Sequence, residues 1–118
     1  MTAAGIVALS LCGEQDSIEV RDATKWLATA PVDPTAWYYH GTYYFAQAMT
    51  QGDGNTAVQG RQRVEDLLLT RQSPDGFWDH TSTDNEYATV GIGGRVHCTS
   101  LAVMSLGVRY HFLPVYQR

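Results

Sequence analysis

His97 and Cys98 stand side by side in an apolar stretch near the C-terminal end of the chain, and both side chains are common zinc ligands. Adjacent residues of a helix point about 100° apart, however, so that one ion is poorly placed to bind both. His80 and His111 could join a metal site only through tertiary contacts. The sequence therefore predicts no metal site and no cofactor.

Other catalytic combinations are incomplete in this sequence. Ser100 follows His97 by one helical turn, but neither a nucleophile elbow nor the third member of a triad accompanies them. Asp84 and Glu86 belong to a polar stretch, residues 79–95, in which two carboxylates are more often solvated than catalytic. This stretch lacks the glycine spacing and the lysine of phosphate-binding loops. It is expected to be a long loop, and long loops in compact domains are often functional.

The composition describes one globular domain and excludes two kinds of partner. The chain has 118 residues, 44% of them hydrophobic and 17% charged, with a net charge of −4. An acidic chain with scattered basic residues is unsuited to nucleic acid, and no apolar run approaches the ~20 residues of a membrane span. Cys12 and Cys98 lack a CxxC spacing, so both are expected to be free and buried in a reducing, cytoplasmic compartment. Any export signal would lie upstream of this chain.

Hydrophobic periodicity predicts helices that alternate between two kinds. One kind is almost free of charge and suits an inner layer, whereas the other is amphipathic and suits an outer layer that faces water. In the amphipathic kind, Trp26 and Val58 are expected on the buried stripes. The predicted helices lie near residues 2–12, 18–30, 36–49, 55–72 and 96–107.

Polar residues mark the starts of the two amphipathic helices. Asp16 or Ser17 is expected to cap the second helix, and Asn55 or Thr56 the fourth. The tail, residues 109–118, is expected to pack across the end of the last helix pair.

The segments also repeat along the chain. Thr2, Thr42 and Thr99 occupy matching places in the three charge-free segments, 40 and 57 residues apart, and the longer interval contains the long loop. In the amphipathic segments, Thr29 precedes Thr70 by 41 residues in similar surroundings. A repeat of this period built from one helix pair is typical of a solenoid or a closed toroid.

A turn-forming stretch follows the fourth helix and predicts a clamp at its end. Pro74 stops the helix, because proline lacks an N–H and disfavours a helical residue before it. Gly76 then allows a tight turn that folds Trp78 back towards Gln72. The Gln72 amide is expected to bond the freed carbonyls of the helix end while its flat face meets the indole.

This Gln-x-x-x-Gly-x-Trp pattern after a leucine-rich helix resembles the QW repeat of the squalene cyclase and protein prenyltransferase superfamily. The resemblance covers nearly the whole chain, and the tail is similar to the ends of bacterial proteins with this repeat. It implies an all-α fold, part of an α/α toroid with an inner ring of helices around a cavity. Residues 1–118 would then be one domain of about two helix-hairpin repeats, the C-terminal part of a longer bacterial protein in which Met1 is an internal position.

The catalytic patterns of that superfamily are not carried over. Squalene cyclases use an aspartate at the start of an inner helix, where this chain has His97, and an imidazole is a poor acid for an alkene. Prenyltransferases bind zinc through Asp-x-Cys, and Cys98 fits the cysteine while Val96 replaces the aspartate. This chain is therefore expected to lack catalytic and metal-binding groups of its own.

The resemblance implies a binding or structural module whose aromatic inner face holds an apolar, isoprenoid molecule. The alternative for these aromatic side chains is inner-helix packing. Two further functions remain open: part of a terpene cyclase or prenyltransferase whose catalytic residues lie upstream, and a protein–protein module or homo-oligomer that pairs through open toroid edges. The candidate lining residues of the cavity are Tyr39, His40, Tyr43, Tyr44, His97 and Cys98.

Overall fold

The computed structural model describes residues 1–32, 37–80 and 91–110, and within them every regular element is helical. This confirms the predicted all-α class. Asp84, Glu86, His111 and nearly all of the tail lie outside the described residues. The elements are α1 (Thr2–Leu11), α2 (Ile18–Thr29), α3 (Tyr38–Met49), α4 (Gly54–Leu69), α5 (Gly91–Gly107) and a short 3₁₀ helix, η1 (Val108–Tyr110).

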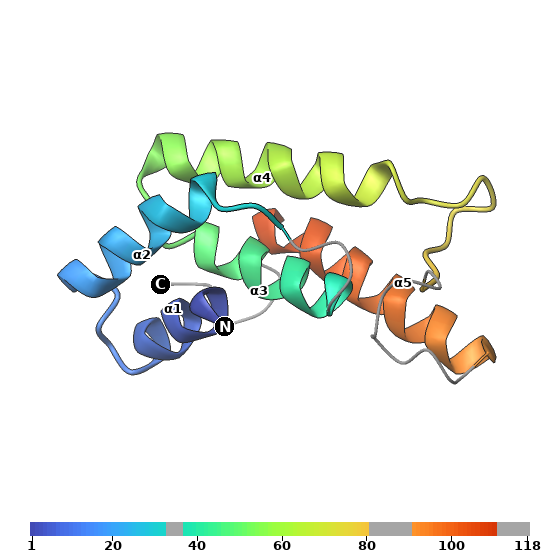
Figure 1. Ribbon diagram of the computed structural model, residues 1–118, viewed down its shortest axis with the longest axis horizontal. Helices are drawn as coiled ribbons and strands as arrows, with labels where there is room; N and C mark the ends of the chain where they lie inside the picture. Colours follow the sequence, from blue (N-terminus) through green and yellow to red (C-terminus); the bar gives the residue numbers. More distant parts are fainter. Residues whose placement is uncertain (33–36, 81–90, 111–118) are drawn as a thin grey trace.

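The helices form two layers, as the alternation in the sequence predicts. Helix α3 packs between α1 and α5, while α2 and α4 contact one another and cover α1 and α3 respectively. In Figure 1, α4 runs along the top of the molecule with α2 beside it, and α3 lies below between α1 and α5. Helices α1, α3 and α5 thus share one layer, in which Arg95 of α5 is the single lysine, arginine, aspartate or glutamate, and the amphipathic helices α2 and α4 share the other.

The helix boundaries differ from the predictions at several ends. Helix α5 begins at Gly91 and not at residue 96, although glycines lower helix propensity by about 1 kcal/mol each. Ser17 caps α2 by accepting a hydrogen bond from the backbone N–H of Val20, as predicted. The cap of α4 is Asp53, whose carboxylate accepts the N–H of Thr56, so the prediction of Asn55 or Thr56 as the cap was wrong.

Two predicted buried side chains in the outer helices are exposed. Trp26 is 58% exposed and Val58 54% exposed. Each lies two residues, about 200° of helical rotation, from a buried position of its own helix: Thr24 in α2 and Gly60 in α4. Val20, Val64 and Leu68 are buried as predicted, so the expected stripes were wrong only at these two positions.

The core is centred on α3, which is the only charge-free helix enclosed along most of its length within the described part of the chain. Helices α1 and α5 lie at the two edges of their layer, and each leaves an apolar face in solvent. The prediction of a buried inner helix was therefore wrong for α1, in which only Ile6 and Ser10 are buried. The prediction that both cysteines are buried was wrong for Cys12, which is exposed, whereas Cys98 is buried, and both are free thiols. The main core cluster contains Tyr38, Tyr39, Phe45, Ala46, Met49, Val64, Leu68, Trp78, Cys98, Ala102 and Val108.

Small hydroxyl residues allow the helices to approach one another inside this core. Ser10, Thr24, Thr42 and Ser105 are buried, and the hydroxyl of each donates to the backbone carbonyl four residues earlier, at 2.7–2.8 Å. Their polar atoms are therefore satisfied within their own helices, which removes most of the cost of burying them.

The clamp after α4 forms, but Trp78 and not Gln72 bonds a carbonyl of the helix end. The indole N–H of Trp78 donates to the carbonyl of Leu68 at 2.8 Å, and Gln72 donates to the carbonyl of Gly76 at 3.1 Å. Gly76 has a φ of 87°, a conformation that favours glycine. The hydroxyl of Thr99 bonds both the N–H and the carbonyl of Trp78 at 3.0 Å. The clamp thus fastens the end of α4 to the middle of α5.

Candidate functional site

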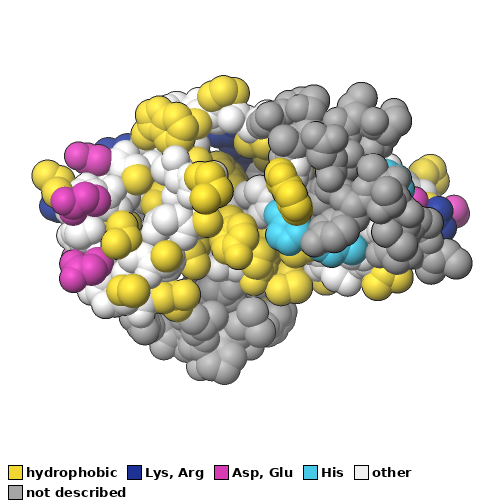
Figure 2. All heavy atoms as spheres, turned by 60° about the horizontal axis from the view of Figure 1, so that its bottom comes forward, with side chains coloured by type: hydrophobic (Ala, Val, Ile, Leu, Met, Phe, Trp, Pro, Cys, Tyr) yellow, Lys and Arg dark blue, Asp and Glu magenta, His cyan; other side chains and the backbone are white. Residues whose placement is uncertain are grey.

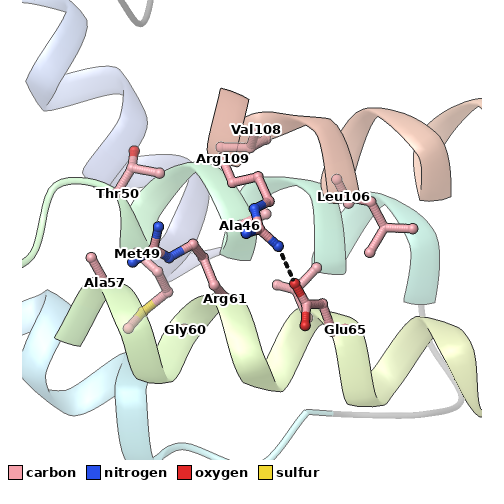
Figure 3. Close-up of a pocket in the computed structure, with 12 residues that line it drawn as sticks. Ala46, Met49, Thr50, Ala57, Gly60, Arg61, Glu65, Leu106, Val108 and Arg109 are labelled. Carbon is pink, nitrogen blue, oxygen red and sulfur yellow. Dashed lines mark hydrogen bonds and ion pairs between the residues drawn. The ribbon is translucent and has the colours of Figure 1, made fainter. Parts of the chain in front are cut away.

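A groove of about 600 Å³ lies between the start of α1, the end of α2 and the first turns of α3. A second cavity, between α3, α4 and α5, is shown in Figure 3. It has a volume of only about 20 Å³, enough for one water molecule, and the ion pair between Arg109 and Glu65 lies beside it at 2.7 Å. The groove is therefore the candidate site.

The described lining of the groove is rich in aromatic side chains. None of the described residues that line it has an acidic or basic side chain other than histidine. Trp26, Trp37 and Tyr44 present their rings there, and they remain 58%, 54% and 39% exposed. Exposed aromatic side chains gathered at one concave site are typical of binding surfaces for apolar ligands. The described lining also includes residues 1–4 of α1 and Leu27, Ala30, Pro31, Val32, Tyr38, His40, Gly41 and Phe45.

One wall of the groove is held in place from α4. The guanidinium of Arg63 donates to the carbonyls of Ala28, at 2.9 Å, and of Ala30, and so satisfies carbonyls freed where α2 ends. The same guanidinium lies 5.2 Å from the ring centre of Phe45. These contacts fix the end of α2 against α3 without a ligand.

Tyr38 fixes the opposite wall. Its hydroxyl donates to the carbonyl of Leu67 at 2.7 Å, and the guanidinium of Arg71 lies 3.6 Å from its ring centre. Burial raises the pKa of Tyr38, although the nearby Arg71 cation opposes this effect. The phenol therefore stays neutral and donates its hydrogen bond at physiological pH.

Of the six predicted lining residues, two line the groove, two lie in the core and two belong to neither. His40 and Tyr44 line the groove, and the ring of Tyr43 lies 5.7 Å from that of Tyr44. Tyr39 and Cys98 are 1% and 0% exposed and belong to the core. His97 belongs to neither set, but its ring lies 5.0 Å from that of His40.

Sequence reasoning missed the two tryptophans of the groove. Trp26 was assigned to the buried stripe of α2, and Trp37 was included in a helix that in fact begins after it. Trp37 precedes α3 with a φ of 52°, in the left-handed region that side chains rarely adopt. This backbone conformation directs the chain into α3 and leaves the indole at the groove.

A polar junction lies at the opposite side of α3, next to the clamp. The Asp79 carboxylate accepts hydrogen bonds from Arg95 at 3.1 Å and from the backbone N–H of His80 at 2.9 Å, and the His80 ring lies at 3.0 Å. The hydroxyl of Tyr39 donates to the carbonyl of Asp79 at 2.8 Å. Burial acts to raise the pKa of Asp79, but the bonds from Arg95 and His80 outweigh it and leave the pKa below its usual value.

Because Asp79 has a lowered pKa in the folded state, it should contribute to acid sensitivity. Its stabilising effect is fully present above the pKa of the unfolded chain, about 3.9, and is lost as the pH falls through the lower folded value. Between pH 5 and pH 3, we therefore expect the free energy of unfolding, measured with urea, to fall less in Asp79→Asn than in the wild type. The control is Asp75→Asn in the exposed turn. Equal losses in the wild type and in Asp79→Asn would contradict this prediction.

Figure 2 shows that the middle of one face is occupied by hydrophobic side chains and histidines, while acidic side chains gather towards the ends of the molecule. Over residues 1–32, 37–80 and 91–110, no three His, Cys, Asp or Glu side chains are grouped so that they could hold a metal ion. None of the helices in those ranges is both long and apolar enough to cross a bilayer.

The comparisons with known proteins add no relative to this description. The chain matches no protein-family model, no curated protein and no solved structure.

Proposed function

We propose that this chain is a non-catalytic binding module for uncharged, isoprenoid-like molecules, built as an arc of a squalene cyclase- or prenyltransferase-like α/α toroid. The observation that carries the proposal is the groove of about 600 Å³, whose described lining has three exposed aromatic rings and no acidic side chain, lysine or arginine. A volume of this order is typical of small-molecule sites. Arg63 and Tyr38 brace its walls, so little ordering is needed when a ligand binds.

Two features of the fold support the family part of the proposal. The charge-free helices and the amphipathic helices lie in separate layers, as in a toroid built from helix hairpins. The Gly76 turn also returns Trp78 to the end of α4, as the QW pattern requires. Both features concern the fold, whereas ligand binding is argued from the groove alone.

Two side chains near α5, His97 and Asp79, could be considered as proton donors, and neither suits a cyclase reaction. His97 stands where a cyclase would need its aspartate. Asp79 is engaged by Arg95 and His80, and its lowered pKa leaves it ionised at neutral pH, with no proton to donate. An alkene requires a strong acid, so neither side chain suits this reaction.

The groove should bind farnesol, and binding should depend on Trp37. We expect Trp37→Ala to weaken the affinity for farnesol at least tenfold, because a large aromatic contact is lost. Farnesyl diphosphate should bind no more tightly than farnesol, since the described lining offers no lysine or arginine for the diphosphate. Isothermal titration calorimetry measures both affinities.

A matched control is Val103→Ala, which removes an apolar side chain that is 55% exposed on α5, outside the described lining of the groove. It should leave the affinity for farnesol unchanged. If Val103→Ala and Trp37→Ala weaken binding equally, or if the wild type binds no farnesol, the groove is not the site.

A second candidate function is association through the open edges of the inner layer. Helix α5 exposes Val96, Val103 and Met104 at helical spacing, and α1 exposes Leu9 and Leu11 at the other edge. Such faces usually meet another surface. Sedimentation velocity tests this function: self-association that Val103→Asp abolishes would support it, and a monomer at all concentrations would exclude a homo-oligomer.

A further inference from the structure

His40 and His97 belong to neighbouring helices of the inner layer, α3 and α5, and their rings lie side by side. The ring centres are 5.0 Å apart and the ring planes are inclined by 40°. Both side chains are half-buried, and Figure 2 shows histidines at the surface in the middle of one face. The fold therefore brings together two imidazoles that are 57 residues apart in the sequence.

This separation fits a shared metal ion. An imidazole nitrogen binds zinc at about 2.0–2.1 Å, which puts each ring centre about 3.2 Å from the ion and two ring centres of a tetrahedral site about 5 Å apart. The chemistry selects the ion, because neutral imidazole suits Zn²⁺, Cu²⁺ and Ni²⁺ better than Mg²⁺ or Ca²⁺.

We propose that His40 and His97 together bind a divalent transition-metal ion through one imidazole nitrogen each. The neighbouring Cys98 is not part of this site, because its side chain is 0% exposed in the core. His80 is also separate, since its ring is held by Asp79 at the polar junction. His40 also lines the groove, but binding of the metal ion by the two imidazoles requires no ligand in the groove.

Trp37 provides an internal reporter for the bound ion. Its ring lies edge-on to His40, with the ring centres 5.6 Å apart. Cu²⁺ bound by the two histidines should therefore quench the fluorescence of Trp37. The ion would also join α3 to α5, so that binding to the folded chain should raise the melting temperature as the concentration of free ion increases.

The test uses the untagged chain and titration with CuCl₂ and ZnCl₂. We expect one Cu²⁺ per chain, with an affinity that falls at least tenfold in His40→Ala and in His97→Ala and is unchanged in the matched control His80→Ala. Trp37→Phe should keep the affinity and lose most of the quenching. Zn²⁺ should raise the melting temperature of the wild type and of His80→Ala, but not of His97→Ala.

Several results would overturn the proposal. The first is Cu²⁺ binding that His40→Ala and His97→Ala both retain. The second is Cu²⁺ binding that only His80→Ala removes, and the third is a wild type that binds no stoichiometric Cu²⁺. Circular dichroism of each variant shows whether it is folded, and so distinguishes the loss of the metal site from the loss of the fold.

Discussion

Replacing Gly60 with alanine is expected to destabilise the chain by about 1–3 kcal/mol, even though alanine is the better helix former. Gly60 is buried in α4 where that helix crosses Met49 of α3. A Cβ at this position would lie 2.7 Å from the Cγ of Met49 and closer still to its Cβ. The Cβ of Met49 is fixed to the backbone, so the clash can be relieved only if the helices separate.

The matched control is Gly5→Ala in α1. Nothing lies within 4 Å of the Cβ that this change adds, and Gly5 is exposed. The same chemical change should there stabilise the protein by about 0.5–1 kcal/mol, because alanine loses less backbone entropy. Urea unfolding measures both changes. Equal effects of the two substitutions would mean that α3 and α4 do not meet at Gly60.

Truncation of Trp78 should be the most damaging single change in the clamp. Trp78 is 3% exposed within the main core, and its indole caps the carbonyl of Leu68. We expect Trp78→Ala to cost about 3–5 kcal/mol, a large part of the stability of a domain of this size. Thermal and urea unfolding followed by circular dichroism would measure this loss.

Two further variants separate packing from hydrogen bonding at this position. Trp78→Phe keeps most of the buried ring and loses the bond to Leu68, which should cost about 1–3 kcal/mol. Trp26→Ala removes an indole that is 58% exposed and should change stability by less than about 0.5 kcal/mol. A loss in Trp26→Ala as large as that in Trp78→Ala would contradict the assignment of Trp78 to the core.

Local physical rules were sufficient to predict the helices and their order. The Pro-Asp-Gly turn returns Trp78 to α4, because the φ restriction of proline and the freedom of Gly76 act within a few residues. The prediction that α4 continues to Gln72 and is stopped by Pro74 was wrong, since the helix ends at Leu69. Charge-free and amphipathic segments likewise separate into two layers, since the charged faces must remain in water.

The candidate site was only partly accessible to the same reasoning. His40 and Tyr44 were predicted to line a cavity, and they line the groove. Tyr39 and Cys98 were predicted beside them but lie in the core, because aromatic residues on every side of α3 give no information about which side is covered. The burial of Thr24 in α2 was also hidden, since threonine resembles a surface residue in the sequence.

The sequence by itself determined the all-α class, the alternation of two kinds of helix and the clamp around Trp78, because these depend on short-range backbone preferences and on hydrophobic periodicity. The tertiary structure alone decided that Trp26 and Trp37 share a groove, that Gly60 is the point of closest approach to Met49, and that His40 meets His97. Each of these facts depends on how one helix is rotated against another. That rotation follows from how many side chains pack together at once, and no local pattern in the chain encodes it.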